Sequence, residues 1–382
     1  MKIATAAQMQ AIDREAIEGL GIPSLELMEQ AGQQVAGLMV ERYAPVSSKR
    51  VVVVCGRGNN GGDGLVVARH LLTAGCPTEV ILLDKAEDLS EDALTNYHRL
   101  HDQQGHRIYE APDEEALARL ESHLDHCDLL VDAIFGTGLN SPAGGRYAEA
   151  IRRMNATGKP IVAVDIPSGL NADTGTIIGE HIVADCTVTF GLPKLAHVLY
   201  PAARSVGELA VADIGFPEAL IASAPIATHL ITPEHLRGAF APRDPEAHKG
   251  TYGHLLIISG SVGKAGACVL ASQGALRAGA GLVTAAVAKS ILPEVSVGAV
   301  EAMTIPLLET PEGTIAHEAV SVVTDELGRF SAVALGPGLT TNPETVAFLG
   351  DLLPAIRVPL VIDADGCNAI AQLGAKALKG TE

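Results

Sequence analysis

A run of five apolar residues, Val51–Cys55, leads directly into a segment that reads G-R-G-N-N-G-G-D-G and ends at Gly64. Short apolar runs rich in β-branched residues are typical of strands buried on both faces, as in parallel sheets flanked by helices. Three glycines of the segment, Gly56, Gly58 and Gly61, have the G-x-G-x-x-G spacing of a dinucleotide-binding turn. The pattern therefore predicts a nucleotide site at the carboxyl end of a buried strand.

Polar residues set this segment apart from an ordinary dehydrogenase turn. Asn59, Asn60 and Asp63 crowd it, and a carboxylate beside a pyrophosphate is repelled unless a cation or a sugar hydroxyl lies between the two. We therefore expect the segment to hold a ligand and a cation together. Asp84, which closes the next strand, is a ribose ligand in the alternative interpretation of the turn as a dehydrogenase fingerprint.

Strand-like and helical patterns alternate through residues 1–221. The strands expected after the first are Glu79–Leu83, Leu129–Ala133, Pro160–Val164 and Cys186–Phe190, and the helical patterns between them include Gly64–Ala74 and Asp113–Leu124. This alternation predicts an α/β fold, a doubly wound Rossmann-like domain with a mostly parallel sheet. Because ligands of such sheets bind beyond the carboxyl ends of strands, we expect the motifs that follow these strands to meet at one edge.

Two amphipathic helices are expected before the first strand, one from about Thr5 and a second after Pro23. The second has an apolar face formed by Leu27, Met28, Ala31, Val35, Leu38 and Met39. Because one sheet is not expected to bury both helices fully, we expect a homo-oligomer, at least a homodimer, through this domain.

A second α/β unit is expected after a segment rich in Ala, Pro and His. Residues 222–247 form this expected linker, with a short helix near Pro233–Gly238, and residues 248–382 form the second, ribokinase-like domain. The patterns at the start of that domain are a strand at Leu255–Ser259, a Gly/Ser loop at Gly260–Gly266 and a helix through Ala278. The loop is not a P-loop, because Ala265 stands where Ser or Thr would supply a magnesium ligand.

The charge balance and the cysteines constrain the partners and the compartment. Asp and Glu outnumber Lys and Arg by 45 to 27, and the net charge of -18 argues against a nucleic-acid partner. The six cysteines are scattered without a C-x-x-C pair, which fits a reducing cytoplasm. Residues 1–19 lack the apolar core of a signal peptide, and no apolar stretch approaches the roughly 20 residues of a membrane span. We therefore expect a cytoplasmic protein without a membrane segment.

The 13 histidines are not expected to bind a metal. His98, His101 and His106 are close in sequence, as are His123 and His126, but they stand among polar residues on helical stretches. Such positions favour surface side chains over metal ligands.

The chain resembles the bifunctional NAD(P)H-hydrate repair enzymes at several long motifs. Those of the family's epimerase half are the G-x-G-N-N-G-G-D-G turn and, in the family's order, Val131–Gly138, Val164–Gly169 and Thr189–Lys194. Those of its ribokinase-like dehydratase half are His248–Gly253, Ala275–Val283, Leu335–Leu339 and Val361–Gly366. The family's H-P-G-E and G-T-G-D motifs do not occur before Glu382, so the resemblance covers a whole epimerase half and the front of a dehydratase, which we expect to be incomplete at its C-terminus.

The resemblance implies repair of hydrated nicotinamide dinucleotides, NADHX and NADPHX. The epimerase half interconverts the R and S hydrates, with Asp165 as the general acid/base, and the dehydratase half uses ADP or ATP with Mg²⁺ to return the S hydrate to NAD(P)H. Because the base and the phosphoryl donors are expected from the G-T-G-D motif, we expect inefficient dehydration by this chain. We also expect an exposed strand edge beside Leu360–Asp363.

The resemblance also implies which residues hold the ligands. The expected substrate-binding residues are Asn59, Asn60, Gly61, Gly62, Asp63, Gly136, Thr137, Gly138, Leu139, Asn140, Ser141, Pro142 and Asp165, with Ala267 and Gly338 in the second domain. The implied metal is potassium, a hard ion that suits the side-chain oxygens of Asn60, Asp132 and Ser168. Lys194 is a further catalytic candidate, either as a partner of a ligand phosphate or as an aid to proton transfer.

Plainer interpretations of these residues stay open. Strand-end aspartates such as Asp132 and Asp165 often cap the following turn, and a lysine after a strand, such as Lys194, usually lies at the surface. Ala267 and Gly338 equally fit close packing between a helix and a strand. The alternative functions are an NAD-dependent dehydrogenase and a non-catalytic nucleotide- or protein-binding module.

Overall fold

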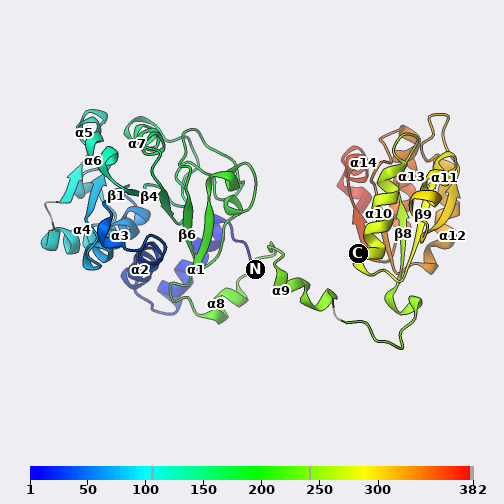
Figure 1. Ribbon diagram of the computed structural model, residues 1–382, viewed down its shortest axis with the longest axis horizontal. Coiled ribbons are helices and arrows are strands. Elements are labelled where there is room, and N and C mark those ends of the chain that lie inside the picture. The colour runs from blue at the N-terminus through cyan, green and yellow to red at the C-terminus, as the bar shows by residue number, and fades with distance from the viewer. Residues whose placement is uncertain (105–106, 241, 379–382) are drawn as a thin grey trace. The chain divides into compact units, whose positions relative to one another are not determined.

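The structure is a computed structural model that describes residues 1–104, 107–240 and 242–378. The chain divides into two compact units, Met1–Ala239 and Phe240–Glu382 (Figure 1). Each unit is built on one parallel sheet with helices, as the alternating sequence patterns predict. Within the described ranges, no helix combines the length and the apolar character that crossing a bilayer requires.

The described part of the first unit contains a seven-stranded sheet in the order β3-β2-β1-β4-β5-β6-β7, with every neighbouring pair parallel. The strands are β1 (Val51–Cys55), β2 (Thr78–Leu82), β3 (Ile108–Glu110), β4 (Leu129–Ala133), β5 (Ile161–Val164), β6 (Cys186–Phe190) and β7 (Glu208–Ala212). The chain starts in the middle of the sheet and winds toward either edge, which confirms the doubly wound, Rossmann-like prediction. The sequence patterns miss the edge strands β3 and β7, because both are partly exposed and β3 is only three residues long.

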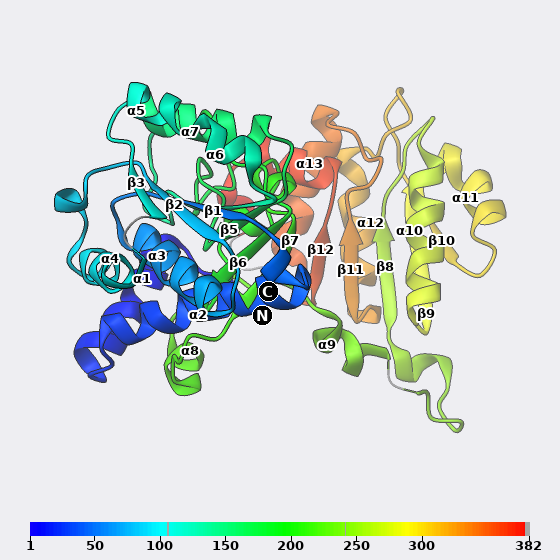
Figure 2. The ribbon, with the colours of Figure 1, turned by 60° about the vertical axis from the view of Figure 1, so that its left-hand side comes forward.

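Alternate residues of β1 pack into separate cores on the two faces of the sheet. Val51, Val53 and Cys55 join the core with α1 (Ala6–Arg14), α2 (Ser24–Arg42), α3 (Asn59–Thr73) and α4 (Glu91–Gln104). Val52 and Val54 join the core with α5 (Glu114–Arg119), α6 (Glu121–His126) and α7 (Gly145–Ala156). The two helical layers are visible in Figures 1 and 2. Two short helices, α8 (Glu218–Ser223) and α9 (Pro233–Leu236), follow β7.

The two leading helices bury their apolar faces within the first unit. α1 starts at a capping box, in which the Thr5 hydroxyl accepts a hydrogen bond from the Gln8 N–H and the Gln8 side chain accepts one from the Thr5 N–H. On α2, five residues of the expected apolar face are no more than 6% exposed, namely Leu27, Met28, Ala31, Val35 and Met39. The argument that an unburied face requires a partner subunit is therefore wrong, and the homo-oligomer itself stays a prediction.

The glycine-rich segment is helical from Asn59 onward, so the prediction of a turn that precedes a helix at Gly64 is wrong for residues 59–63. α3 begins at Asn59 rather than near Gly64, because the glycines permit close packing against the sheet. A β-carbon on Gly61 would lie 1.8 Å from the carbonyl oxygen of Gly56, and one on Gly64 would lie 2.4 Å from the Ala133 β-carbon. The glycines therefore let the first turns of α3 approach the ends of β1 and β4.

Gly61→Ala and Gly37→Ala are expected to change stability in opposite directions. The new methyl of Gly61→Ala meets backbone, and such overpacking should lower the free energy of unfolding by about 3 kcal/mol. Gly37 lies in α2 with nothing within 4 Å of a β-carbon, so Gly37→Ala should raise it by about 0.5–1 kcal/mol through the lower backbone entropy of alanine. Chemical denaturation measures both changes, and a neutral Gly61→Ala variant would contradict the packing argument.

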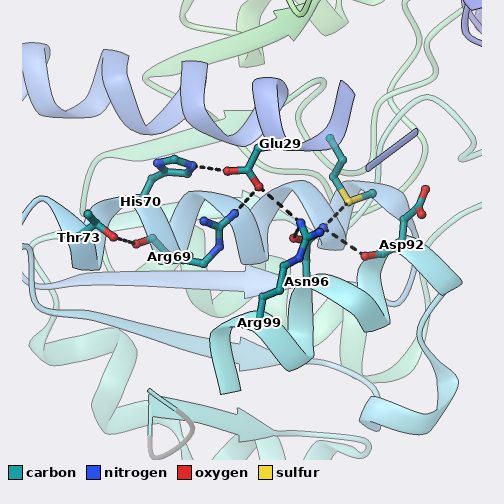
Figure 3. Close-up of polar contacts among 8 residues, drawn as sticks. Glu29, Arg69, His70, Thr73, Asp92, Asn96 and Arg99 are labelled. Carbon is teal, nitrogen blue, oxygen red and sulfur yellow. Dashed lines mark hydrogen bonds and ion pairs between the residues drawn. The ribbon is translucent and has the colours of Figure 1, made fainter. Parts of the chain in front are cut away.

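A polar cluster joins α2, α3 and α4 (Figure 3). Glu29 of α2 forms ion pairs with Arg69 of α3 and, at 3.8 Å, with Arg99 of α4. Asn96 of α4 donates a hydrogen bond from Nδ2 to the Met28 sulfur at 3.1 Å. These contacts fix α2 against the two following helices and hold the Met28 side chain in place.

The described part of the second unit contains a five-stranded parallel sheet in the order β10-β9-β8-β11-β12. The strands are β8 (His254–Ile258), β9 (Leu282–Ala288), β10 (Met303–Leu307), β11 (Ala332–Leu335) and β12 (Leu360–Ile362). The helices are α10 (Ala265–Ala278), α11 (Leu292–Gly298), α12 (Val320–Glu326), α13 (Pro343–Leu352) and α14 (Asp365–Leu373). β12 forms an edge of the sheet and its Val361 is 65% exposed, so the expected exposed edge is present.

Candidate active site

The first unit contains a cavity of about 650 Å³ at the carboxyl ends of its central strands. Segments that follow β1, β4, β5 and β6 line it together with α1 and α2, so the motifs expected at one edge of the sheet do meet there. The volume lies within the range of about 300–1,000 Å³ that is typical of small-molecule sites. The polar residues of the wall are Gln10, Asp13, Ser24, Arg57, Asn59, Asn60, Asp63, Asp92, Thr137, Tyr147, Asp165 and Lys194.

The cavity brings together many, but not all, of the residues expected to bind substrate. Those that line it are Asn59, Asn60, Asp63, Gly136, Thr137, Gly138, Leu139 and Asp165. Those that lie outside its wall are Gly61, Gly62, Asn140, Ser141 and Pro142. Gly61 packs against Gly56 and Gly62 packs against Met28. Close packing therefore explains why glycine occupies these two positions, without contact to a ligand.

Asp165 and Lys194 form a buried ion pair at the cavity wall. Lys194 Nζ lies 2.6 Å from Asp165 Oδ1, and the two side chains are 2% and 14% exposed. Lys194 also donates to the hydroxyl of Thr189 at 2.8 Å, and that hydroxyl donates to Asp165 Oδ1 at 3.0 Å. The interpretation of Lys194 as a surface residue is therefore wrong, because its charge is neutralised inside the protein by a carboxylate at the end of the neighbouring strand β5.

The second oxygen of Asp165 is left open to the cavity. Among the described residues, every hydrogen bond to the carboxylate goes to Oδ1. Asp165 Oδ2 lies beside Gly136, where an added β-carbon would be 3.4 Å from it and 3.5 Å from Asn60 Oδ1. The absence of a side chain at Gly136 thus keeps the free carboxylate oxygen accessible to a ligand.

The backbone of Asp165 is held in an unusual conformation by His197, which the sequence interpretation missed. Asp165 has φ +64°, a left-handed conformation that is uncommon for residues other than glycine. The Lys194 N–H donates to His197 Nδ1 at 2.9 Å, so Nε2 carries the proton and donates to the Asp165 carbonyl oxygen at 3.0 Å. Strain of this kind persists where the surroundings fix it, and here it aims the carboxylate into the cavity.

The surroundings of Asp165 and His197 set their charges. Burial alone would raise the pKa of Asp165, but the charge and hydrogen bond of Lys194 outweigh it, so that pKa lies below its ordinary value. Burial and the charge of Lys194 lower the pKa of His197 to about 4. At neutral pH Asp165 is therefore a carboxylate and His197 is uncharged.

Two further carboxyl groups share this cavity and have raised pKa values. Burial, followed by repulsion from Asp165 and Asp13, raises the pKa of Asp63 well above its ordinary value. Burial raises the pKa of Asp13 to about 6, with an opposing effect from Lys194 and a further increase from Asp165. The sequence interpretation missed Asp13. One signal was available: this charged residue follows Met9 by one helical turn and so lies on the apolar face of the helix.

Asp132 and Ser168 form a closed network just behind the cavity wall. The Ser168 hydroxyl donates to Asp132 Oδ1 at 2.7 Å, its backbone N–H donates to Oδ2 at 2.8 Å, and the Ile134 N–H donates to Oδ1 at 3.2 Å. The Phe135 N–H donates to the Ser168 hydroxyl at 2.9 Å. Burial raises the pKa of Asp132 to about 6, although these hydrogen bonds oppose the increase. The network fixes the turn after β4 that forms part of the wall.

Asn60 is the residue of the site whose polar atoms most need a ligand. Its side-chain oxygen and nitrogen are both buried, and neither has a hydrogen-bond partner among the described residues. An unpaired buried amide is costly, and it is explained most simply by a ligand or ion that this oxygen or nitrogen contacts. Together with the nearby carboxylates, the amide oxygen suits a hard cation.

Asp84 does not reach the cavity, which weakens the dehydrogenase alternative. The side chain is 2% exposed and accepts hydrogen bonds from Arg146 at 2.5 Å and from the Tyr147 hydroxyl at 2.7 Å. Both carboxylate oxygens are therefore occupied within the protein, and only Tyr147 of this group lines the cavity.

In the second unit the structure places Ala267 beside Gly338. A β-carbon on Gly338 would lie 3.1 Å from that of Ala267 and 3.1 Å from that of Lys264. The hydroxyls of Ser259 and Ser261 donate to the carbonyl oxygens of Pro337 and Gly338 and tie the two loops together. The pair thus lies at the carboxyl ends of β8 and β11, where sheets of this type bind ligands.

The histidines of the two sequence clusters lie at the surface or in ion pairs. His98, His101 and His126 are exposed, and His123 pairs with Glu79 at 2.7 Å. His106 lies outside the described residues. Across the residues that the structure does describe, no group of three or more His, Cys, Asp or Glu residues is arranged to hold a metal.

The chain is similar to known proteins along nearly its whole length. Residues 24–196 match the family described as YjeF-related protein N-terminus, and residues 255–380 match the family described as NAD(P)H-hydrate dehydratase. The bifunctional NAD(P)H-hydrate repair enzyme Nnr of Moorella thermoacetica is 44% identical over 97% of this chain and 70% of the relative. That of Thermofilum pendens is 40% identical over 98% of this chain and 70% of the relative.

Solved structures resemble parts of the chain. A yeast protein of known crystal structure has a TM-score of 0.48 and 26% identity, over 60% of this chain and 97% of its own. The ADP/ATP-dependent NAD(P)H-hydrate dehydratase of Bacillus subtilis, co-crystallised with ATP/Mg²⁺, has a TM-score of 0.29 and 29% identity, over 35% of this chain and 45% of its own.

Proposed function

Because the chain belongs to the family of bifunctional NAD(P)H-hydrate repair enzymes, we propose that the cavity of its first unit interconverts the R and S forms of NADHX and NADPHX. The observation that carries this proposal is the Asp165 carboxylate, which is fixed through one oxygen and leaves the other open to the cavity. A positioned group of this kind is what proton transfer to and from a substrate requires.

The chemistry of the hydrates assigns roles to the residues around Asp165. The hydrates carry a hydroxyl at C6 of the reduced nicotinamide ring, and proton transfer accompanies their interconversion, whether the hydroxyl is lost and regained or the ring opens. Asp165, ionised at neutral pH, accepts the proton at Oδ2. Lys194 holds Oδ1 and His197 holds the backbone, so the carboxylate is oriented toward the cavity before substrate enters.

The dinucleotide is proposed to lie along Asn59–Asp63 and Gly136–Pro142. In support, the first of these segments opens α3, and helix N-termini favour phosphate groups because their N–H groups and dipole point outward. Arg57 lies on the same wall and adds a positive charge. The dehydrogenase alternative leaves the Asp63 and Asp165 carboxyls without a purpose, and a purely binding role leaves the strained, ion-paired Asp165 unexplained.

Asp165→Asn is expected to lower the rate of epimer exchange at least about 100-fold, because an amide cannot accept the proton. Exchange between separated R and S hydrates, followed by chromatography, measures the rate. The matched control is Asp213→Asn, since Asp213 also follows a strand of this sheet but is exposed, lies outside the cavity wall and accepts one backbone N–H that asparagine can equally accept. Wild-type exchange in folded Asp165→Asn would exclude Asp165 from the mechanism.

Potassium is proposed as the metal of this site, held by Asn60 with Asp132 and Ser168. The support is the unpaired buried oxygen of Asn60 and the local excess of carboxylates. The Asp132 and Ser168 oxygens already take part in hydrogen bonds, whereas the Asn60 oxygen does not. Asn60 is therefore the best supported of the three proposed potassium ligands. The ion would supply a fixed positive charge between the carboxylates and the anionic ligand.

Potassium is expected to stabilise the first unit, because an ion that binds only the folded state shifts the folding equilibrium. At a potassium concentration ten times the Kd, the free energy of unfolding should rise by about 1.4 kcal/mol, which raises Tm by roughly 3–5 °C for a unit of this size. The measurement compares Tm in KCl with Tm in choline chloride at equal ionic strength. Asn60→Ala should abolish the difference and Asn140→Ala should retain it, whereas an equal response of both variants would contradict the assignment.

The second unit is proposed to carry the ADP- or ATP-dependent dehydration of the S hydrate, with Mg²⁺ bound to the nucleotide. The match of residues 255–380 to the dehydratase family supports this role, and the loops that carry Ala267 and Gly338 are the proposed hydrate pocket. The assignment of residues 1–221, 222–247 and 248–382 to the epimerase domain, the linker and the dehydratase domain is proposed on the same grounds.

Residues 1–382 alone are expected to dehydrate the S hydrate slowly, because the base and the phosphoryl donors assigned to the G-T-G-D motif are not among them. Recovery of the reduced-nicotinamide absorbance from the purified S hydrate, with ADP or with ATP and Mg²⁺, measures this step. Rapid recovery would contradict the expectation and place the dehydration chemistry on residues of β8–α14.

A cytoplasmic location and a homo-oligomer complete the proposal. All six cysteines are free and five of them are buried, which suits a reducing compartment. The small-molecule hydrates are the proposed partners, with neither nucleic acid nor membrane.

A further inference from the structure

Asp13 places an uncommitted carboxyl group on the wall of the cavity. It is half-buried on α1, one turn after Met9, and both residues line the cavity. Among the described residues, no hydrogen bond or ion pair involves the Asp13 carboxyl. The described part of the fold thus leaves this carboxyl free to contact a molecule bound in the cavity.

The start of the chain holds Asp13 in this position. The Ala4 N–H donates to the Pro193 carbonyl oxygen at 2.9 Å, and Ala4 forms a bridge with Lys194 immediately before α1 begins. The Ala6 N–H is capped by Asp173, and Met9 packs beside Gly191. α1 is therefore fixed to the same turn that carries Lys194.

We propose that Asp13 is a second catalytic residue of the epimerisation, which transfers protons from the helical wall of the cavity while Asp165 transfers them from the strand ends. This inference rests on the proposed function of the first unit. It assigns a role that Asp165 cannot fill alone, because the hydroxyl leaves from one face of the ring and returns on the other.

The two half-reactions balance with one proton shared between the two carboxyls. Protonated Asp13 gives its proton to the C6 hydroxyl, the C6–O bond breaks and releases water, and the lone pair of the ring nitrogen forms a C=N⁺ bond. Water then attacks C6 from the opposite face, Asp165 takes the proton of that water, and the electron pair returns to nitrogen. A turnover in the reverse direction, or exchange with solvent, returns the proton to Asp13.

The electrostatics of the cavity favour this division of roles. Asp63, Asp165 and Lys194 interact electrostatically with Asp13 or with one another, and the other titratable or charged residues of the cavity wall are Arg57, Asp92 and Tyr147. Lys194 pairs with Asp165 and holds its pKa low, whereas burial raises the pKa of Asp13 to about 6. Two carboxyls whose surroundings push their pKa values apart supply one acid and one base at the same pH. At a pH between the two pKa values the pair carries a single proton, which lies on Asp13. Asp13 loses this proton as the pH rises through about 6, so epimer exchange should decline there.

Asp63 is the alternative second acid, but its position suits it less well. Burial and repulsion from Asp165 and Asp13 raise its pKa well above the ordinary value, which favours the protonated form and makes Asp63 a weaker candidate for the base of the reverse reaction. A protonated Asp63 can donate a hydrogen bond to the substrate, which makes it a binding group.

The test is the pH dependence of epimer exchange in full-length wild type and in Asp13→Asn, Asp13→Glu, Asp63→Asn and Glu18→Gln. Asp13→Asn should lower kcat by about 100-fold or more, leave KM within about threefold, and abolish the alkaline decline near pH 6. Asp13→Glu should restore part of kcat together with the decline. Asp63→Asn should raise KM and keep the decline, and Glu18→Gln, an exposed carboxyl in the turn after α1, should match wild type.

The outcomes separate the two levels of the proposal. A wild-type protein without epimer exchange refutes the proposed function itself. Wild-type exchange combined with an unchanged kcat and pH profile in Asp13→Asn overturns only the role of Asp13. Loss of the decline in Asp63→Asn and its retention in Asp13→Asn transfers the role to Asp63 and likewise overturns the inference. Circular dichroism and Tm of each variant identify any that do not fold.

Discussion

The buried ion pair between Lys194 and Asp165 is the interaction on which the geometry of the site depends. Breaking a buried pair by removing one partner typically costs about 3–5 kcal/mol, because the other charge stays in a medium of low polarity. The pair joins the ends of β5 and β6, two parallel neighbours, and can form only when their register is correct. Thr189 and His197 add hydrogen bonds to the same two residues, so the strained backbone of Asp165 is fixed from several directions.

The charges around this pair explain why the site contains both an acid and a base. Lys194 is the one lysine on the wall of this cavity in the described part of the chain, and of Asp13, Asp63 and Asp165 only Asp165 forms an ion pair with it there. The other two carboxyls remain in a buried, negative environment that favours their protonated forms. A fixed arrangement of one lysine and three carboxyls thus orders their pKa values without any change of conformation.

The sequence predicts the central sheet well because buried parallel strands are continuous apolar runs, as at Val51–Cys55 and Leu129–Ala133. It places Asp165 at the site because the carboxyl ends of such strands meet at one edge, whereas the catalytic role of Asp165 is what the family resemblance implies. It does not reveal Asp13 or His197, which reach the site from elements that the sequence patterns do not link to it. It leaves Lys194 open between a catalytic candidate and a surface residue, because burial of a lysine depends on a partner from another strand. The glycines predict a turn at residues 59–63, but glycines are also needed where the start of a helix packs closely against a sheet.

The attachment of the first residues to the end of the sheet orders the assembly of the site. Lys2 donates hydrogen bonds to the carbonyl oxygens of Ile221, Ala222 and Ala224, and Ala4 bridges Lys194. During synthesis α1 leaves the ribosome long before the segment against which it packs, so Asp13 has no cavity wall to join until β6 and the turn after it have emerged. The central strands can pair earlier, and the reactive centre forms only when the beginning of the chain returns to its sheet.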